Sequence, residues 1–228
     1  MTYADRLARF SEADLYVVIT ESFCGGRSAL DVLDAVLDAG VRLIQFREKD
    51  LDGGELCRRA GQFRERTAQH DALLIIDDRV DIALAVDADG VHLGQSDLPV
   101  SAACAIAPDL LIGASTHNLD EALAAQDAGA SYVNIGPIFS TQTKNVSGGA
   151  IGPEAIDAIR PHLHVPWTTM GGIKLHNIRQ VLERGARHEP ARAHGQLRAR
   201  HDVAANGDVE GESRSSRLRQ SVEVATRV

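Results

Sequence analysis

Several groups of polar side chains in this chain begin where an apolar, strand-like segment ends. In a fold whose parallel strands all open on one face, these groups converge. Their carboxylates, cations and hydroxyls are what a metal-bound polyphosphate requires. The groups are Gln45 to Lys49, Asp77 to Arg79, Gly94 to Asp97 and Ser140 to Lys144.

Two acids, Asp78 and Asp97, are the candidate metal ligands. Mg2+ usually takes one or two carboxylates and leaves its other positions to water and substrate phosphate oxygens. Two strand-end acids in neighbouring units fit that arrangement. The alternative is helix capping, because a helix is expected to start near Arg79 and another near Pro99.

Arg47, Lys49 and Lys144 are cations at strand ends that could neutralise a diphosphate and the charge that builds as it leaves. Lys144 lies in a long segment, 140–152, which suggests a mobile cover over a site. Thr141 and Thr143 flank Gln142, so they could hold a second phosphate; the alternative is that all three are ordinary turn residues.

Three further positions carry open alternatives. Ser115 ends a predicted strand and either caps the next helix or faces the ligand. Gly171–Gly172 ends another, where the backbone either approaches a phosphate or makes a tight turn. His92 lies inside an apolar strand, and we expect a core or supporting role for it.

The charge, the cysteines and the distribution of apolar residues indicate which classes of protein this chain can belong to. A net charge of -8 gives no electrostatic support for nucleic-acid binding. Three scattered cysteines fit reduced thiols in a reducing compartment. No apolar stretch approaches the length of a membrane span, and charged residues near Met1 argue against a signal peptide. We therefore expect a cytoplasmic protein without membrane contact.

A repeated unit predicts the fold: a helical segment ends in glycine and a short apolar segment follows, as at Gly40, Gly90 and Gly129. Strict alternation, without a glycine-rich dinucleotide motif at Gly25–Gly26, favours a (β/α)8 TIM barrel over a doubly wound sheet. Strands are predicted near 15–19, 41–46, 73–77, 90–93, 111–115, 131–135 and 165–170. A short helix precedes them, and further helices are predicted near 28–39, 54–69, 79–86, 99–107, 118–128, 153–160 and 174–184.

The eighth βα unit is predicted to be missing or disordered. A strand should start near Arg187, but Pro190 follows shortly after it. Proline lacks the backbone N–H that a central strand needs for its hydrogen bonds. Residues 187–228 contain no Lys, Ile, Phe, Tyr, Trp or Met, so they lack apolar surface to bury. We therefore predict a barrel domain over 1–186 and an aberrant, disordered tail over 187–228. A frameshift or misjoined reading frame would explain it; a genuine disordered extension is the alternative.

The chain resembles the thiamine-phosphate synthase family between about Leu15 and Ala186. The motifs that carry the resemblance are 45–49, 77–83, 90–99, 113–115, 136–144 and 171–173. The resemblance implies a Mg2+-dependent (β/α)8 transferase. It would join 4-amino-5-hydroxymethyl-2-methylpyrimidine diphosphate to a thiazole phosphate, giving thiamine phosphate and diphosphate.

The resemblance also implies roles for individual residues. It assigns the pyrimidine diphosphate to Gln45, Phe46, Arg47, Glu48, Lys49, Asp77, Ser115 and Lys144. It assigns the thiazole phosphate to Thr141, Gln142, Thr143 and Gly172, and Mg2+ to Asp78 and Asp97. Lys144, Ser115 and Arg47 are the expected catalytic groups, which would assist departure of diphosphate without a covalent enzyme intermediate.

Two departures from the family pattern keep alternatives open. Asp77 stands where the family often has Asn, and Asn can donate as well as accept. In addition, the family's eighth strand brings a Val/Ile-Ser step to the thiazole phosphate, whereas Arg192–Ala193 stand there in this chain. The alternatives are a catalytically impaired barrel remnant and a related thiazole tautomerase. The partners expected are small molecules, and a homo-oligomer is possible.

Overall fold

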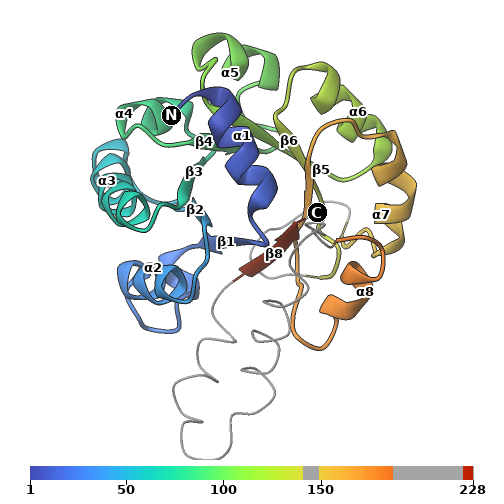
Figure 1. The fold of residues 1–228 in the computed structure, drawn as a ribbon, viewed down its shortest axis with the longest axis horizontal. Coiled ribbons are helices and arrows are strands. Elements are labelled where there is room, and N and C mark those ends of the chain that lie inside the picture. The colour runs from blue at the N-terminus through green and yellow to red at the C-terminus, as the bar shows by residue number, and fades with distance from the viewer. Residues whose placement is uncertain (141–148, 187–222, 228) are drawn as a thin grey trace, which may run out of the picture.

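The computed structural model describes residues 1–140, 149–186 and 223–227. Strands form a barrel inside a ring of helices (Figure 1). The strands are β1 (Leu15–Ile19), β2 (Leu43–Phe46), β3 (Leu73–Asp77), β4 (Gly90–Leu93), β5 (Leu111–Thr116), β6 (Tyr132–Ile135), β7 (Trp167–Thr169) and β8 (Glu223–Arg227). The helices are α1 (Tyr3–Glu12), α2 (Ala29–Asp38), α3 (Gly53–Gln69), α4 (Val80–Ala85), α5 (Val100–Ile106), α6 (Leu119–Asp127), α7 (Glu154–Ile159) and α8 (Ile178–Leu182), with short 3-10 turns η1 (Glu21–Phe23) and η2 (Arg160–His162).

The predicted alternation is confirmed: β1 to β7 pair in sequence order, and every pair is parallel. Glycine ends two of the three repeated units as expected, with φ of +92° at Gly40 and +95° at Gly129. The third differs, because Asp87 takes the left-handed conformation (φ +52°) and Gly90 begins β4. A side chain at Gly90 would collide with the backbone oxygen of Leu111, 2.5 Å from an added Cβ.

The eighth position of the sheet is filled in a way that the sequence did not predict. No parallel eighth βα unit follows α8 in the part of the chain that the structure describes, in agreement with the prediction. Instead β8 pairs antiparallel with β1 and with β7 and closes the barrel (Figure 1). The expected tail therefore contributes one strand. Without a strand between them, β1 and β7 would each leave a row of backbone N–H and C=O groups unpaired. An extended segment from a distant part of the chain can pair with both rows.

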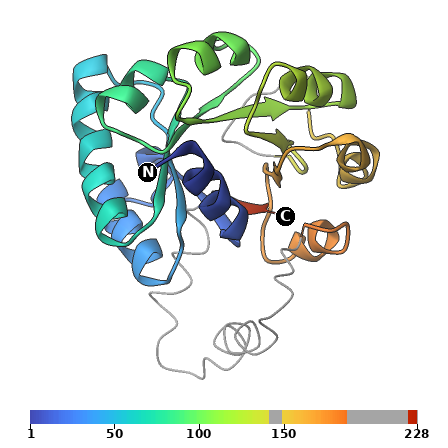
Figure 2. The ribbon, with the colours of Figure 1, turned by 45° about the horizontal axis from the view of Figure 1, so that its top comes forward.

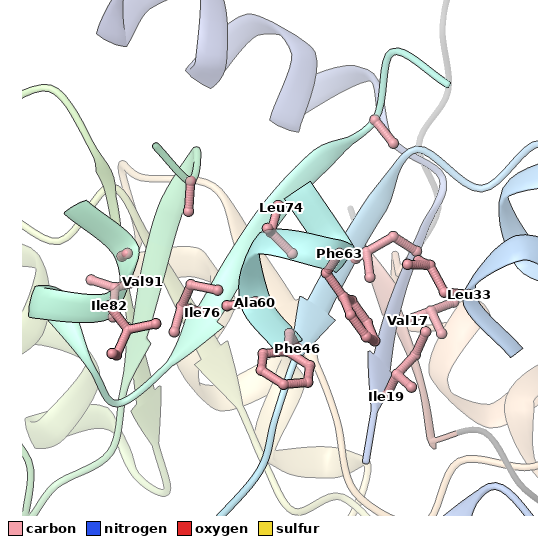
Figure 3. Packing of buried hydrophobic residues seen from close by; sticks show 14 of the residues in the cluster. Val17, Ile19, Leu33, Phe46, Ala60, Phe63, Leu74, Ile76, Ile82 and Val91 are labelled. Carbon is pink, nitrogen blue, oxygen red and sulfur yellow. The ribbon is translucent and has the colours of Figure 1, made fainter. Parts of the chain in front are cut away.

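The strands bury side chains on both faces. One set points outward and packs against the helices, including Val17, Phe46, Leu74 and Val91 (Figure 3). The alternate set points into the barrel and forms a separate apolar cluster. Its members are Phe10, Ala13, Tyr16, Leu43, Leu73, Ile75, Leu111 and Tyr132. This period of two fixes which residues of each strand can reach the barrel interior.

Helix α1 lies across one end of the barrel (Figure 2). It begins with a capping box between Thr2 and Asp5. Its buried Arg6 contacts Asp89, which is 2% exposed, and Arg64 contacts the other oxygen of Asp89 at 2.7 Å. Because Asp89 directly precedes β4, α1 covers the amino-terminal end of the strands and leaves the opposite end for the predicted site.

Candidate functional site

Cations from the end of β2 meet carboxylates from the end of β3. Lys49 Nζ lies 3.0 Å from Asp77 Oδ2 and also contacts the carboxylate of Asp78. Arg47 Nε lies 3.5 Å from the same Asp77 oxygen. Burial acts to lower the pKa of Lys49, but the carboxylates of Asp77 and Asp78 outweigh it and raise that pKa. Lys49 is therefore a permanently charged cation that faces two acids.

The backbone directs the Asp78 side chain toward this cluster. Its φ of +61° is left-handed, a conformation that non-glycine residues seldom adopt, and its N–H donates to the His92 carbonyl at 2.8 Å. The capping alternative is wrong for Asp78, because the N-cap of α4 is Arg79 and no side chain caps it. Asp78 is thus held in an uncommon backbone conformation beside Lys49.

Asp97 completes a pair of neighbouring acids. Its Oδ2 accepts from the Gly94 N–H at 2.7 Å, and no side chain caps α5, so Asp97 closes the loop after β4 instead of capping a helix. Burial, the charge of Asp77 and a hydrogen bond with Asp97 raise the pKa of Asp78 to about 6, against the opposing effect of Lys49. Among the described residues, no group of three or more His, Cys, Asp or Glu side chains is placed to hold a metal ion.

Ser115 faces the barrel interior. Its Oγ lies 3.0 Å from His92 Nε2, while the Ser115 carbonyl accepts from Gln95 Nε2 at 2.6 Å. Capping of α6 is performed by Asn118, whose side chain accepts from the Glu121 N–H. The capping alternative for Ser115 is therefore wrong, and His92 is a buried, hydrogen-bonded core residue, which is one of the two roles expected for it.

Gln45 joins the site through residues that sequence reasoning missed. Its Nε2 donates to the Tyr16 hydroxyl at 2.8 Å, and Tyr16 lies 3.0 Å from the Tyr132 hydroxyl. Both tyrosines are fully buried inside the barrel. The period of two places both tyrosines on the inner faces of their strands, but it does not reveal that their hydroxyls meet.

Two predicted residues lie apart from this cluster. Phe46 points outward and packs against Phe63 of α3, with ring centroids 4.5 Å apart (Figure 3). Glu48 Oε1 accepts from the Glu21 N–H at 2.7 Å, so it anchors the turn after β1. The prediction that these side chains meet the ligand neglected strand alternation and loop anchoring, and we leave both out of the site proposed below.

The β6 and β7 ends approach each other closely at Gly172. Its φ is +64°, and a Cβ there would lie 2.5 Å from the Ser140 carbonyl oxygen. The Gly172 carbonyl accepts from Asn177 Nδ2 at 3.0 Å, an anchor that the sequence did not reveal. The predicted residues Thr141, Gln142, Thr143 and Lys144 lie outside the described residues.

The structure also bears on two general expectations from the sequence, the state of the cysteines and the lack of a membrane span. All three cysteines, Cys24, Cys57 and Cys104, are free thiols. In the part of the chain that the structure describes, none of the helices has the length and apolar character needed to cross a membrane.

Known proteins are similar to this chain in sequence and in fold. The family model described as thiamine monophosphate synthase matches residues 15–188. A thiamine-phosphate synthase of Dictyoglomus thermophilum is 41% identical over 188 residues, covering 82% of this chain and 84% of that protein. One from Chloroflexus aurantiacus is 41% identical over 180 residues, covering 79% and 83%. The solved thiamine phosphate pyrophosphorylase from Pyrococcus furiosus matches with a TM-score of 0.71 and 38% identity, over 78% of this chain and 84% of that one. The chain belongs to the thiamine monophosphate synthase family.

Proposed function

We propose that this chain joins 4-amino-5-hydroxymethyl-2-methylpyrimidine diphosphate to a thiazole phosphate, giving thiamine phosphate and diphosphate. The observation that carries the proposal is the cluster of Arg47, Lys49, Asp77 and Asp78 at the carboxyl ends of β2 and β3. Active sites of barrels lie at this end of the strands. The resemblance implies that the diphosphate binds there, and the cluster would supply its cations and Asp78, one of the two acids proposed for its metal.

We further propose that Asp78 and Asp97 hold Mg2+. Two observations support the fit: the two carboxylates contact each other, and burial with the charge of Asp77 raises the pKa of Asp78 to about 6. Both observations describe acids whose repulsion a divalent cation would relieve. Mg2+ usually keeps several water or phosphate ligands, so two carboxylates suffice. When bound, Mg2+ supplies charge neutralisation on the diphosphate oxygens.

The charges of the cluster set the chemistry that the chain itself performs. Arg47 and Lys49 pair with the carboxylates of Asp77 and Asp78, and Asp97 lies beside Asp78, so these five groups carry more negative than positive formal charge. A diphosphate therefore binds poorly here without a cation. With the diphosphate in place, Arg47 and Lys49 stabilise the negative charge that develops as the C–O bond to the pyrimidine methylene breaks. The thiazole nitrogen then attacks the methylene carbon.

The remaining roles follow from the resemblance. Gln45, Asp77 and Ser115 would position the pyrimidine diphosphate, and Lys144 would add a cation beside the leaving group. Thr141 to Thr143 and Gly172 would hold the thiazole phosphate. Three free thiols, together with small-molecule substrates, support a reducing cytoplasmic location.

The test is an assay of the purified full-length chain that follows diphosphate release and thiamine phosphate formation together. We expect both products in equal amounts, only when both substrates are present, and loss of turnover when EDTA removes Mg2+. Soluble, folded protein without turnover would refute the proposal. Isomerisation of the thiazole alone would favour the tautomerase alternative.

A further inference from the structure

The loop that joins β7 to α8 is held on one side by the loop that follows β6. The Ile138 N–H donates to the Met170 carbonyl at 2.9 Å. The Phe139 N–H donates to the Gly171 carbonyl, also at 2.9 Å. These two bonds extend the contact between the β6 and β7 segments beyond the ends of both strands. The backbone that leads into Gly172 is therefore fixed on its β6 side.

On its other side the same loop is held by the side chain of Asn177. Asn177 Nδ2 donates to the Gly172 carbonyl at 3.0 Å, and Asn177 Oδ1 accepts from the Lys174 N–H at 2.6 Å. The amide has one possible orientation, because a backbone carbonyl only accepts and a backbone N–H only donates. Asn177 is 7% exposed, so water does not readily replace these bonds. Asn177 thus fixes the direction of the Gly172 carbonyl.

Helix capping does not account for the side chain of Asn177. The residue stands at the N-cap of α8, where asparagine usually accepts from a backbone N–H of the first helical turn. Its side chain makes no such bond. Both ends of its amide turn back into the loop of residues 172–174 instead. Aspartate or serine would serve a cap equally well, whereas the contacts in the loop need a donor beside an acceptor.

We propose that Asn177 is a positioning residue for the thiazole phosphate, because it orients the peptide between Gly172 and Ile173. That peptide bond is trans, so its C=O and N–H point in opposite directions. With the carbonyl held by Asn177, the Ile173 N–H points away from Asn177 and is the donor to the phosphate. The loops after the seventh and eighth strands of barrels commonly bind phosphate.

The inference rests on the proposed function, which assigns Gly172 to the thiazole phosphate. It adds the residue that orients this glycine and a specific donor, the Ile173 N–H. Gly172 has a φ of +64°, in a region where glycine moves freely, so its own backbone preference does not hold the peptide in one orientation. The two bonds of Asn177 supply that constraint.

The first test reads this one peptide. Gly172–Ile173 is the only glycine–isoleucine step in the chain, so full-length protein labelled with 13C-carbonyl glycine and 15N-isoleucine gives a single NMR correlation that reports both groups. Asn177→Asp keeps the acceptor but loses the donor, and we expect the Gly172 carbonyl carbon to shift upfield. An unchanged carbonyl signal in folded Asn177→Asp would overturn the proposal. This measurement needs neither substrate nor turnover.

The second test adds thiazole phosphate to the same labelled protein. We expect the Ile173 amide proton of the native chain to move downfield as it donates to a phosphate oxygen. The dissociation constant should rise about tenfold in Asn177→Asp. Asn177→Ala removes the donor without adding a charge and should weaken binding by a similar factor. Weak binding by the aspartate variant alone would assign the loss to charge repulsion and refute positioning, and so would an Ile173 proton that does not move.

Steady-state kinetics separates positioning from a general loss of structure. We expect the KM for the thiazole phosphate to rise about tenfold in Asn177→Ala, with no change in the KM for the pyrimidine diphosphate. A merely structural Asn177 would lower the amount of active enzyme, and therefore the apparent kcat, without changing either KM, which would contradict the proposal.

A matched control is Asn118→Asp, the same substitution at the exposed N-cap of α6. It should leave the Gly172 carbonyl signal and both KM values as they are in the native chain. Thiazole phosphate that binds through the Ile173 N–H without turnover would refute the proposed function and still support the role of Asn177.

Discussion

The carboxyl ends of β2 to β5 and the seam where β8 lies between β7 and β1 differ in how they are built. At the β2 to β5 ends, parallel strands deliver Lys49, Asp77 and Asp78 into direct contact. At the seam, a strand from residues 223–227 runs antiparallel to both neighbours. A parallel strand presents its carboxyl end on the site side of the barrel, whereas an antiparallel strand presents its amino end there.

The comparison shows that a strand can close the barrel without supplying the part of the site that a parallel eighth strand would carry. β8 supplies backbone partners to β1 and β7, which any extended segment can do. Its direction is opposite to that of the parallel strand that an eighth βα unit would supply. Most of the residues proposed to bind the pyrimidine diphosphate and Mg2+ follow the parallel strands β2 to β5, whereas the step expected at the eighth strand for the thiazole phosphate has no parallel strand to carry it in the described part of the chain.

The largest effect is expected from the proposed metal ligands. Asp78→Asn keeps the shape of the side chain but removes the charge that Mg2+ needs, so we expect turnover to fall by about 10³-fold. The matched control is Asp81→Asn, in the first turn of α4, where the side chain is 64% exposed and paired with Arg79. Equal activity of Asp78→Asn and the native chain, measured as diphosphate release, would remove Asp78 from the metal site.

A second change weakens the seam without touching the β2 to β5 ends. Ala225→Pro removes a backbone N–H from a strand with neighbours on both sides, and we expect the free energy of unfolding to fall by about 2 kcal/mol. Ala225→Ser retains the N–H and serves as the control. Denaturant unfolding measures both variants, and equal stability would show that β8 does not hold the barrel closed.

The pH dependence of metal binding tests the β2 to β5 ends further. With a pKa of about 6, Asp78 must lose a proton to bind Mg2+, so the apparent affinity should fall about tenfold per pH unit below pH 6. Without metal, this raised pKa means that the folded chain binds more protons than the unfolded chain between about pH 4 and 6. The contribution of Asp78 to stability therefore falls as pH rises through that window.

Calorimetric Mg2+ titrations from pH 5 to 8 measure the first effect, and thermal unfolding of the metal-free protein measures the second. Asp78→Asn is the control for both, since it cannot titrate. A Mg2+ affinity that stays constant down to pH 5 would show that Asp78 is not a ligand.

A smaller effect is expected at Asp77. Its carboxylate occupies Arg47 and Lys49, the cations proposed to meet the diphosphate. Asp77→Asn should release them and lower the KM for the pyrimidine diphosphate about threefold, with the gain shrinking at high salt. A higher KM would instead show that the charge of Asp77 contributes to substrate binding.

Local patterns predicted the parallel part of the fold closely. The apolar segment 73–77 coincides with β3 (Leu73–Asp77), because a buried parallel strand is marked by its own apolar residues. β8 was not predicted, because its position depends on pairing with the edges of β1 and β7. Those partners are far away in the sequence, so the local composition of residues 223–227 does not indicate the pairing. The start of α8 was also predicted early, at 174 instead of Ile178, since Lys174 begins a turn that Asn177 closes.

The candidate site was predicted in part for similar reasons. Lys49, Asp77 and Asp78 come together because their strands are neighbours and their positions follow strand ends. Phe46 was misplaced because a single position along a strand decides whether a side chain faces the interior or the helices. Tyr16 and Tyr132 were missed because a buried tyrosine looks like core until its hydroxyl partner on another strand is known.

The most direct test of the account compares the two KM values of this chain with those of the Pyrococcus furiosus pyrophosphorylase, measured side by side. We expect the KM for the pyrimidine diphosphate to agree within about threefold, because the two proteins share the fold whose parallel strands β2 to β5 carry most of the residues proposed to bind it. We expect the KM for the thiazole phosphate to be at least about tenfold higher here, because the strand at the seam is reversed. Agreement of both KM values would contradict the account, and so would a defect confined to the pyrimidine diphosphate.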